Sequence, residues 1–469
     1  MISPPPGAAA PEDAADILIH NALLLTLEPG AQPVFPGYVT VRDGKIAGVG
    51  ECRRARDLPP ARERLDARGA VVLPGLVNTH LHAPMVWFRG LADDLPLKQW
   101  LTEFIFPAEG GWLTPERAYQ GTLLAAAELI RGGVTTVADG YFFASEVRRA
   151  LYDAGLRGVA AQGVVDFPAP GVPDPAANLE VTADFLAAGN GFDRISSAIF
   201  CHSPYTCGPE TLQKAKDLAR SQSARFFIHL AETREEVAEV QGRTDLTPAA
   251  YLDSLGVLDA GTVAVHAVWL DPREQELLAR REVKVSHCPE SNLKLAAGVA
   301  PVPELLDLGV TVGLGTDGAA SNNNLDLWGE MSLAARLHKV WRRDPTVLPA
   351  ARVVALATRE GAAVLGLHEA VGTLTPGKEA DLIVVDLDAP HLTPLYDPYS
   401  HLVYAARAAD VRHVMVAGRW LLFDRRFTTL NWAEIAERIQ KDSRDLISFC
   451  RNIRPRTLAP DSGNRENND

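Results

Sequence analysis

The central part of the chain alternates short apolar segments with longer segments in which apolar residues recur at helical spacing. Between about Val71 and Gly366, eight segments have the character of strands: VVLPGLVNTHLH, TTVADG, GVAAQGVVD, SSAIFCHSP, RFFIHLAE, GTVAVHAVW, VKVSHCPESN and VTVGLGTDG. Their apolar residues run continuously, which is typical of strands buried on both faces in a parallel sheet. Helix-like segments such as PERAYQGTLLAAAELIRGG separate them. This repetition predicts a (β/α)₈ TIM-type barrel.

The two flanks have a different pattern. ADILIHNALLLTL and YVTVRDGKIAGVG near one end, and VGTLTPGKEADLIVVDL and VRHVMVAGRWLLF near the other, are β-branched runs interrupted by Gly and Pro, without helical periodicity. We therefore predict an α/β protein in which a barrel, residues 71–366, is inserted into a small β-sandwich domain built from residues 16–70 and 367–430. Residues 1–15 are expected to be a disordered leader, and residues 431–469 a helix followed by a polar tail.

Composition narrows the function classes. The 469 residues include 46 Lys and Arg against 59 Asp and Glu, a net charge of -13, which argues against nucleic acid as a partner. The five cysteines are scattered, with no C-x-x-C pair, so we expect a reducing, cytoplasmic location without a disulfide framework. No apolar run approaches the roughly 20 residues of a membrane span. A homo-oligomer is compatible with the sequence, which does not determine the oligomeric state.

Several predicted strands end on a histidine or a carboxylate. Residues two apart in a strand face the same side, so both histidines of the THLH motif can point into the barrel mouth. The candidates are His80 and His82 at the first strand, His229 and Glu232 at the fifth, His266 at the sixth and Asp317 at the eighth. Active sites of such barrels form at the carboxyl ends of the strands. Neutral imidazoles with one carboxylate suit Zn²⁺ or Fe²⁺, so these ends predict a metal site.

The motifs LPGLVNTHLH, HLAE, VAVHAVW, SHCPESNLKL and GLGTDGAASNNN, with the flanking β domain, resemble the amidohydrolase superfamily over nearly the whole chain. Within it, the stretch from HLHAPMVWFRGLADDLPLKQWL to FPAE is similar to the branch that deaminates 5'-methylthioadenosine and S-adenosylhomocysteine. The resemblance implies one catalytic metal held by His80, His82, His229 and Asp317. Two-metal members use a carboxylated lysine at the end of the fourth strand, whereas this strand ends in CHSP. Zinc is the expected ion and iron the alternative.

The implied reaction is hydrolytic deamination of an adenine nucleoside to its inosine analogue and ammonia. Metal coordination lowers the pKa of water to around 7. Asp317 is expected to accept the proton of the attacking water, which His266 holds in line. Glu232 is expected to protonate the ring nitrogen and to pass a proton to the departing ammonia. An ordinary structural role for Glu232 is that of a carboxylate at the positive end of the following helix.

Four more residues are implied in substrate binding. Trp100 is expected near the substrate, Glu109 at the ribose hydroxyls and His202 at the nucleoside. In the ordinary alternatives, Trp100 is a core residue of an amphipathic helix, Glu109 is a solvated loop carboxylate, and His202 is a hydrogen-bonding residue at a strand end. Gln162 stands where arginines are expected to clamp an amino-acid carboxylate, and residues 158–193 contain no Lys or Arg. We therefore expect 5'-methylthioadenosine and adenosine to be better substrates than S-adenosylhomocysteine.

Two alternatives remain open from the sequence. A relative acting on a free purine or pterin base, or on a triazine, would use the same scaffold, but it would have no ribose for Glu109 to bind. A barrel that has lost catalysis and serves as a binding module would be expected to have lost metal ligands, all of which are present here.

Overall fold

The computed structural model describes residues 14–189 and 191–453. Residues 1–13 of the predicted leader and the predicted polar tail lie outside the described residues, and the first strand, β1, begins at Ala15. No described helix is both long and apolar enough to cross a bilayer. No disulfide joins the cysteines of the described part of the chain.

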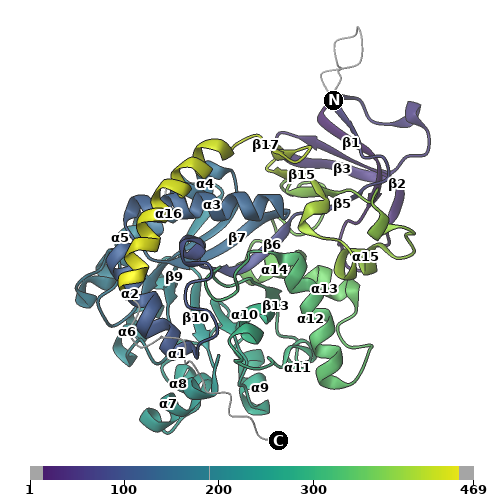
Figure 1. The fold of residues 1–469 in the computed structure, drawn as a ribbon. Helices are drawn as coiled ribbons and strands as arrows, with labels where there is room; N and C mark the ends of the chain where they lie inside the picture. Colours follow the sequence, from purple (N-terminus) through teal and green to yellow (C-terminus); the bar gives the residue numbers. More distant parts are fainter. Residues whose placement is uncertain (1–13, 190, 454–469) are drawn as a thin grey trace, which may run out of the picture.

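The predicted barrel is confirmed. Eight parallel strands follow one another in chain order around it (Figure 1). They are β6 (Leu76–Leu81), β7 (Val134–Tyr141), β8 (Arg157–Val164), β9 (Ile195–Cys201), β10 (Phe226–Leu230), β11 (Thr262–His266), β12 (Lys284–His287) and β13 (Val312–Leu314). The seam between β13 and β6 is closed just beyond β13, where the backbone N–H groups of Thr316 and Asp317 both donate to the His80 carbonyl at 3.1 Å. Asn78 reinforces the seam by donating to the Thr316 hydroxyl at 2.8 Å.

Helices cover the outside of the barrel. The main ones are α3 (Pro115–Arg131), α4 (Ala144–Ala154), α5 (Asn178–Ala187), α6 (Pro209–Ser221), α7 (Arg234–Thr244), α8 (Pro248–Ser254), α9 (Pro272–Arg280), α10 (Pro289–Lys294), α11 (Val302–Asp307), α12 (Leu327–Arg342), α13 (Ala350–Leu356) and α14 (Arg359–Leu365). Caps fix where several begin: the Thr114 hydroxyl accepts from Arg117 N ahead of α3, and Asp271 forms a capping box with Glu274 at α9. Apolar residues fill both the layer between helices and strands and the barrel interior, where Phe200 and Phe227 stack.

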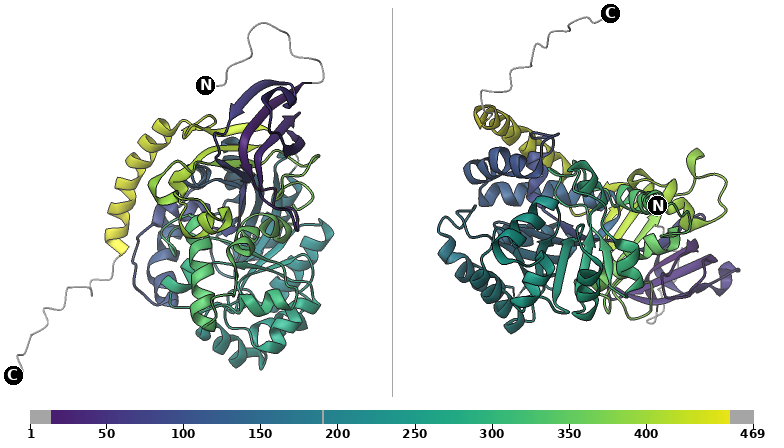
Figure 2. Two further views of the ribbon diagram at one scale, coloured as in Figure 1. Left: turned by 90° about the vertical axis from the view of Figure 1, so that its right-hand side faces the viewer. Right: turned by 90° about the horizontal axis from the view of Figure 1, so that it is seen from below.

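Both flanks of the chain join in one domain, as predicted. Its strands form a single mixed sheet in the order β17-β16-β15-β14-β5-β1-β2-β3, with β4 paired to β1. Figure 2 shows the purple strands of the N-terminal part beside the yellow-green strands of the C-terminal part. The strands are β1 (Ala15–Leu24), β2 (Val34–Arg42), β3 (Lys45–Glu51), β4 (Ala61–Asp66), β5 (Val71–Pro74), β14 (Leu382–Val385), β15 (Val411–Val416), β16 (Arg419–Phe423) and β17 (Arg426–Phe427). The antiparallel pair of β5 and β14 is where the N-terminal and C-terminal parts meet.

The predicted first barrel strand, Val71 to His82, is divided between the two domains. β5 pairs with β1 and β14 in the flanking sheet, and β6 alone belongs to the barrel. The chain passes between the two sheets at Gly75, where a Cβ would lie 2.1 Å from the Thr135 hydroxyl oxygen. A continuous apolar run does not reveal this division, because both strands are fully buried.

A helical segment and the C-terminal helix lie over one side of the barrel mouth. The segment consists of α1 (Leu97–Trp100), a π-helical turn η3 (Leu101–Ile105) and α2 (Phe106–Trp112). The C-terminal helix α16 (Trp432–Ile453) runs along α3 and α2 (Figure 1). Leu446 of α16 is buried in the same apolar cluster as Trp100 and Trp112. The predicted C-terminal helix therefore supports the segment that carries Glu109.

The tight passage at Gly75 predicts the effect of enlarging this residue. In Gly75→Ala the new Cβ overlaps the buried Thr135 side chain, so we expect Tm to fall by about 5 °C. The matched control is Gly242→Ala in α7, where nothing lies within 4 Å of the added Cβ and alanine favours the helix. Thermal unfolding followed by circular dichroism compares the two, and equal Tm values would contradict the argument.

Candidate metal centre and active site

Four predicted metal ligands meet at the carboxyl ends of β6, β10 and β13. The Nε2 atoms of His80 and His229 are 3.4 Å apart. The Nε2 atoms of His80 and His82 each lie 3.4 Å from Oδ1 of Asp317. One nitrogen from each of the three histidines falls within 4.8 Å of the others, and all four residues are buried. The side chains therefore surround one small volume of the size that a single cation occupies.

The chemistry of these groups fits a divalent transition metal. Burial lowers the pKa of His80 to about 3, and it also lowers the pKa values of His82 and His229, so the imidazoles are neutral and keep their lone pairs. Burial alone would raise the pKa of Asp317, but the His80 hydrogen bond and the neighbouring imidazoles hold it well below its usual range. Three neutral imidazoles and one carboxylate form a ligand set typical of catalytic Zn²⁺ or Fe²⁺.

Surrounding hydrogen bonds orient these ligands. His82 donates from Nδ1 to the Gly140 carbonyl at 2.6 Å, which leaves Nε2 free to face the centre. The Oδ2 atom of Asp317 accepts from the hydroxyls of Ser291 and Ser321, each at 2.7 Å, so Oδ1 is the oxygen turned towards the histidines. Such outer contacts fix the tautomer and orientation of metal ligands.

No lysine lies at the end of β9, where a two-metal site would need one. His202 follows the strand instead, and its Nδ1 lies 3.0 Å from the Thr206 hydroxyl. Its ring is next to that of His229, with centroids 4.9 Å apart. The described residues therefore favour one metal.

Glu232 and His266 face each other beside the metal ligands. His266 Nε2 lies 3.8 Å from Glu232 Oε1, and its Nδ1 donates to the Asn292 side-chain oxygen at 2.9 Å. Burial, with the Asp317 charge as a second cause, raises the pKa of Glu232 to about 8. A carboxyl group with a pKa near neutrality is suited to exchange a proton with a bound ligand.

The turn after β10 is what aims Glu232 into the site. Ala231 is left-handed (φ 50°), an unfavourable conformation for a residue with a Cβ. The Glu236 carboxylate accepts from the backbone N–H groups of Ala231 and Glu232, each at 2.8 Å, and holds this turn. Thr233, rather than Glu232, caps α7 by accepting from Glu236 N. Glu232 therefore lies one residue before the N-cap of α7, and its side chain faces His266.

An inner cavity opens next to this centre. His82, Glu109, Tyr141 and His202 line it, together with Phe106, Phe142, Phe167 and Phe200. Glu109 projects from α2, is only 4% exposed and accepts a hydrogen bond from the Tyr141 hydroxyl. Burial raises the pKa of Glu109 to about 7, and the Tyr141 hydrogen bond opposes this rise. Glu109 is therefore a buried cavity carboxylate and not the solvated loop residue of the ordinary alternative.

Two predicted substrate contacts lie elsewhere. Trp100 donates from Nε1 to the Leu91 carbonyl at 3.1 Å and packs in the apolar cluster beneath α16. Gln162 bonds through its side-chain amide to Ala144 N at 3.4 Å and to the Gly163 carbonyl at 3.1 Å. Neither side chain lines the inner cavity or the outer cavity described next.

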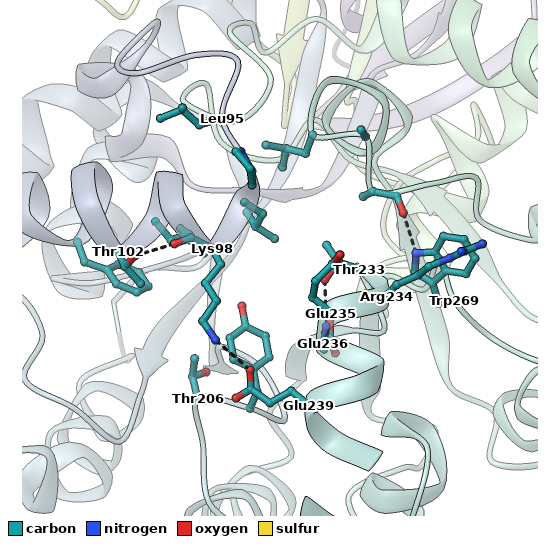
Figure 3. Close-up of a pocket in the computed structure, with 18 of the residues that line it drawn as sticks. Leu95, Lys98, Thr102, Thr206, Thr233, Arg234, Glu235, Glu236, Glu239 and Trp269 are labelled. Atoms are coloured by element: carbon teal, nitrogen blue, oxygen red, sulfur yellow. Dashed lines mark hydrogen bonds and ion pairs between the residues drawn. The ribbon is translucent and has the colours of Figure 1, made fainter. Parts of the chain in front are cut away.

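A larger outer cavity of about 830 Å³ lies over the ends of β9 to β12 (Figure 3). Phe106 and Phe167 line both cavities, with ring centroids 5.4 Å apart, so the two spaces adjoin at this aromatic pair. The outer cavity is bounded on one side by the segment from Asp94 to Phe106 and on the other by the loops that follow Glu232 and His266.

Sequence reasoning missed several supporting residues. They are Tyr141, Glu236, Ser291, Asn292 and the aromatic pair Phe106 and Phe167. Two local signals were available: the SHCPESN motif contains both polar supports that follow β12, and Glu236 comes four residues after Glu232. The aromatic pair joins positions 61 residues apart (167 − 106), and no local pattern connects them.

The fold and the site define a (β/α)₈-barrel protein with a divalent-metal centre at its strand ends. The chain matches the model of the amidohydrolase family over residues 71–421. It is 47% identical over 432 residues to 5-methylthioadenosine/S-adenosylhomocysteine deaminase of Syntrophobacter fumaroxidans, covering 92% of this chain and 98% of that protein. The chain belongs to the amidohydrolase family.

Two further proteins, one compared by sequence and one by structure, are similar to this chain. A 5'-deoxyadenosine deaminase of Methanosarcina mazei is 43% identical over 436 residues, covering 92% of this chain and 99% of that protein. The crystal structure of an adenosine deaminase from Xanthomonas campestris with bound zinc superposes with a TM-score of 0.91 at 35% identity, covering 93% of this chain and all of that one.

The geometry predicts how metal binding responds to loss of a ligand. His229→Ala removes one of three converging imidazoles, so we expect zinc affinity to fall at least 100-fold, while the unaltered chain binds about one equivalent. The control is His368→Ala, because this histidine is exposed and distant from the centre. Equilibrium dialysis with metal analysis measures both, and unchanged zinc affinity in His229→Ala would contradict the assigned site.

Proposed function

We propose that the protein is a metal-dependent aminohydrolase that converts adenine nucleosides to their inosine analogues and ammonia. The observation that carries this proposal is the buried carboxyl group of Glu232, which faces His266 beside the four metal ligands, next to a cavity that contains a second buried carboxyl group, Glu109. Membership of the amidohydrolase family and the deaminase names of its relatives support the same reaction.

The bound metal and the protein's side chains have separate roles in the proposed reaction. His80, His82, His229 and Asp317 would hold a divalent ion, and such an ion would supply a Lewis acid that lowers the pKa of water towards neutrality. Zinc is the proposed ion, because the ligand set suits it and the adenosine deaminase from Xanthomonas campestris contains it. The cytoplasmic location expected from cysteine usage stays a prediction.

The protein's own groups then move protons. Asp317 accepts the proton of the attacking water through Oδ1, the oxygen that faces His80 and His82 and also accepts from Gly318 N, while two serine hydroxyls hold Oδ2. His266, fixed by Asn292, presents Nε2 towards the reacting carbon and orients the water. Glu232 donates its proton to the ring nitrogen, so that negative charge does not build up on the purine as the water oxygen adds to the ring carbon. It then takes up the proton of the newly added hydroxyl group and passes it to the amino group, which leaves as ammonia while the ring carbon keeps the oxygen as a carbonyl. The proton held by Asp317 restores the acid form of Glu232.

Glu109 distinguishes a nucleoside from a free base. It lies in the inner cavity, and its carboxylate can accept from two adjacent hydroxyls of a ribose. Tyr141 orients the carboxylate by donating to one of its oxygens. A free purine, a pterin or a triazine offers no diol, and a non-catalytic binding module has no need for the buried carboxyl group of Glu232. Both alternatives leave one of these buried carboxyl groups without a role.

Replacement of Glu232 tests the proposal. Glu232→Gln keeps the size of the side chain but removes its acid, so we expect kcat for adenosine to fall by about 10²–10⁴ while zinc remains bound. The control is Glu276→Gln, at an exposed position on α9 that lines neither cavity. Loss of adenine absorbance and release of ammonia follow the reaction across adenosine, 5'-deoxyadenosine, 5'-methylthioadenosine and free adenine. Near-normal turnover in Glu232→Gln would refute the assignment, and turnover of free adenine alone would favour the free-base alternative.

We also propose that S-adenosylhomocysteine is the poorer substrate. A zwitterionic tail gains from a cation that binds its carboxylate. Residues 158–193 contain no Lys or Arg, and the amide of Gln162 is engaged by backbone groups. We expect kcat/KM to be at least about tenfold higher for 5'-methylthioadenosine, the equivalent of one charge-assisted hydrogen bond. Steady-state kinetics with both nucleosides decides this, and a higher kcat/KM for S-adenosylhomocysteine would overturn it.

A further inference from the structure

Two serines on different segments hold one side of Asp317. Its Oδ2 atom accepts from Ser291 in α10 and from Ser321 in the loop that follows β13, each at 2.7 Å. The two serine hydroxyls are themselves 3.3 Å apart. Because these contacts leave Oδ1 facing the histidines, the orientation of this metal ligand depends on where the two serine-bearing segments lie.

One carboxyl group joins these two segments. Glu330 lies on α12 and is fully buried, with 0% of its surface exposed. Its Oε2 accepts from the backbone N–H of Glu290, the neighbour of Ser291, at 3.0 Å. Its Oε1 accepts from the side-chain amide of Asn322, the neighbour of Ser321, at 2.7 Å. Each oxygen of Glu330 thus holds one of the two serine-bearing segments.

The first turn of α10 takes its cap from another helix. Cys288 at the N-cap position provides no side-chain cap, and Pro289 has no N–H group to donate. The N–H of Glu290 is one of the helix-terminal donors that need an acceptor from outside the helix. Glu330 supplies this acceptor, so the start of α10 is tied to α12.

The hydrogen bonds of Asn322 fix the direction of its amide. Its Nδ2 also donates to the Thr316 carbonyl at 2.8 Å, and its Oδ1 accepts from the Asn324 amide at 3.0 Å. Turning the amide over would place its oxygen against the Thr316 carbonyl and its nitrogen against the Asn324 donor. Glu330 therefore meets two fixed donors, and a carboxyl group offers an acceptor oxygen to each, whereas an amide offers only one.

A buried carboxyl group in this position is costly for the fold. Burial and the charge of Glu290 raise the pKa of Glu330 well above its usual range. An apolar side chain of similar size would avoid this cost. Glu330 lines neither cavity, so it is not placed to contact a substrate. Its hydrogen bonds to the two serine-bearing segments are the role that fits its position.

We infer that Glu330 is a positioning residue for Asp317: it holds the segments of Ser291 and Ser321 together, so that Oδ1 of Asp317 faces the metal centre. The effect on metal affinity does not depend on which reaction the centre performs. The effect on turnover rests on the proposed function, because it takes Asp317 as the acceptor of the water proton.

Replacing Glu330 by glutamine tests this inference. Glu330→Gln keeps the shape of the side chain but turns an amide N–H₂ group towards one of the two fixed donors, so one serine-bearing segment is released. We expect zinc affinity, measured by equilibrium dialysis, to fall about 10–100-fold, the usual effect of removing a group that orients a metal ligand. At saturating zinc, we expect kcat for adenosine to fall about tenfold while KM changes less than about twofold, because Glu330 borders neither cavity.

The matched control is another buried glutamate whose two oxygens accept from backbone N–H groups. Glu274 accepts from Ala249 N at 3.3 Å and from Asp271 N at 3.0 Å, and it lines neither cavity. Glu274→Gln loses one such bond in the same way. It is expected to lower Tm while zinc affinity and kcat stay unchanged.

A double-mutant cycle separates positioning from a general loss of stability. Ser291→Ala and Ser321→Ala, combined, remove the hydroxyls through which Glu330 acts on Asp317. In that background, adding Glu330→Gln is expected to change the zinc Kd by less than about threefold, since residues that act through one another are not additive. A general loss of stability would weaken zinc binding by the same factor with and without the two hydroxyls.

The outcomes also separate this inference from the proposed function. Unchanged zinc affinity in folded Glu330→Gln, or an equal loss with and without the serine hydroxyls, overturns the positioning role. If circular dichroism shows that Glu330→Gln does not fold, Asn322→Ala replaces it, because this variant removes one of the two donors; unchanged zinc affinity there overturns the role equally. If zinc affinity responds as expected but the unaltered protein does not deaminate adenosine, the positioning role stands and the proposed function fails.

Discussion

Asp317 places a buried negative charge among four buried imidazoles, and much of the barrel mouth is organised around it. Removing a carboxylate from water costs on the order of several kcal/mol unless partners replace the solvent. Here two serine hydroxyls, the Gly318 N–H group and the His80 and His82 rings surround it. The backbone of Asp317 also closes the barrel seam by donating to the His80 carbonyl. Closure of the fold and assembly of the site therefore depend on the same residues.

Several residues at the carboxyl ends of the barrel strands have strained backbone conformations that direct side chains towards the metal centre. Ala231, His266 and Asp317 all have left-handed backbone conformations, with φ of 50°, 69° and 60°. Each such non-glycine residue costs roughly 1–3 kcal/mol and persists only where its surroundings enforce it. Glu236 enforces the turn before Glu232, and Asn292 holds the His266 ring. The side chains with a proposed role in the reaction are thus directed inward by neighbours that have none.

The two cavities have different physical characters, which suits them to different parts of one ligand. The inner cavity contains His82, His202 and the hydrogen-bonded pair of Glu109 and Tyr141, so it can recognise polar groups. The outer cavity has largely apolar walls, with Lys98 paired to Glu239 and Arg234 stacked on Trp269 at its edge. The helical segment that carries Glu109 borders both, and α16 packs behind it. Elements added outside the barrel therefore form part of the wall of both cavities.

The sequence by itself determined the barrel, its flanking β domain and the residues of the metal centre. Continuous apolar strands and a histidine or carboxylate at the strand end are local features, and parallel strands necessarily bring their carboxyl ends together. Only the tertiary structure decided which neighbours face the ligand. Gln162 follows Ala161, which packs inside the barrel, so its side chain points to the opposite face and bonds to the start of α4. Glu109 is buried because α16 and the barrel enclose α2. Val71 to Pro74 leave the barrel because they pair with β14, which begins more than 300 residues later in the chain (382 − 71). Such long-range contacts leave no periodic trace in the sequence, since they depend on the packing of segments far apart along the chain.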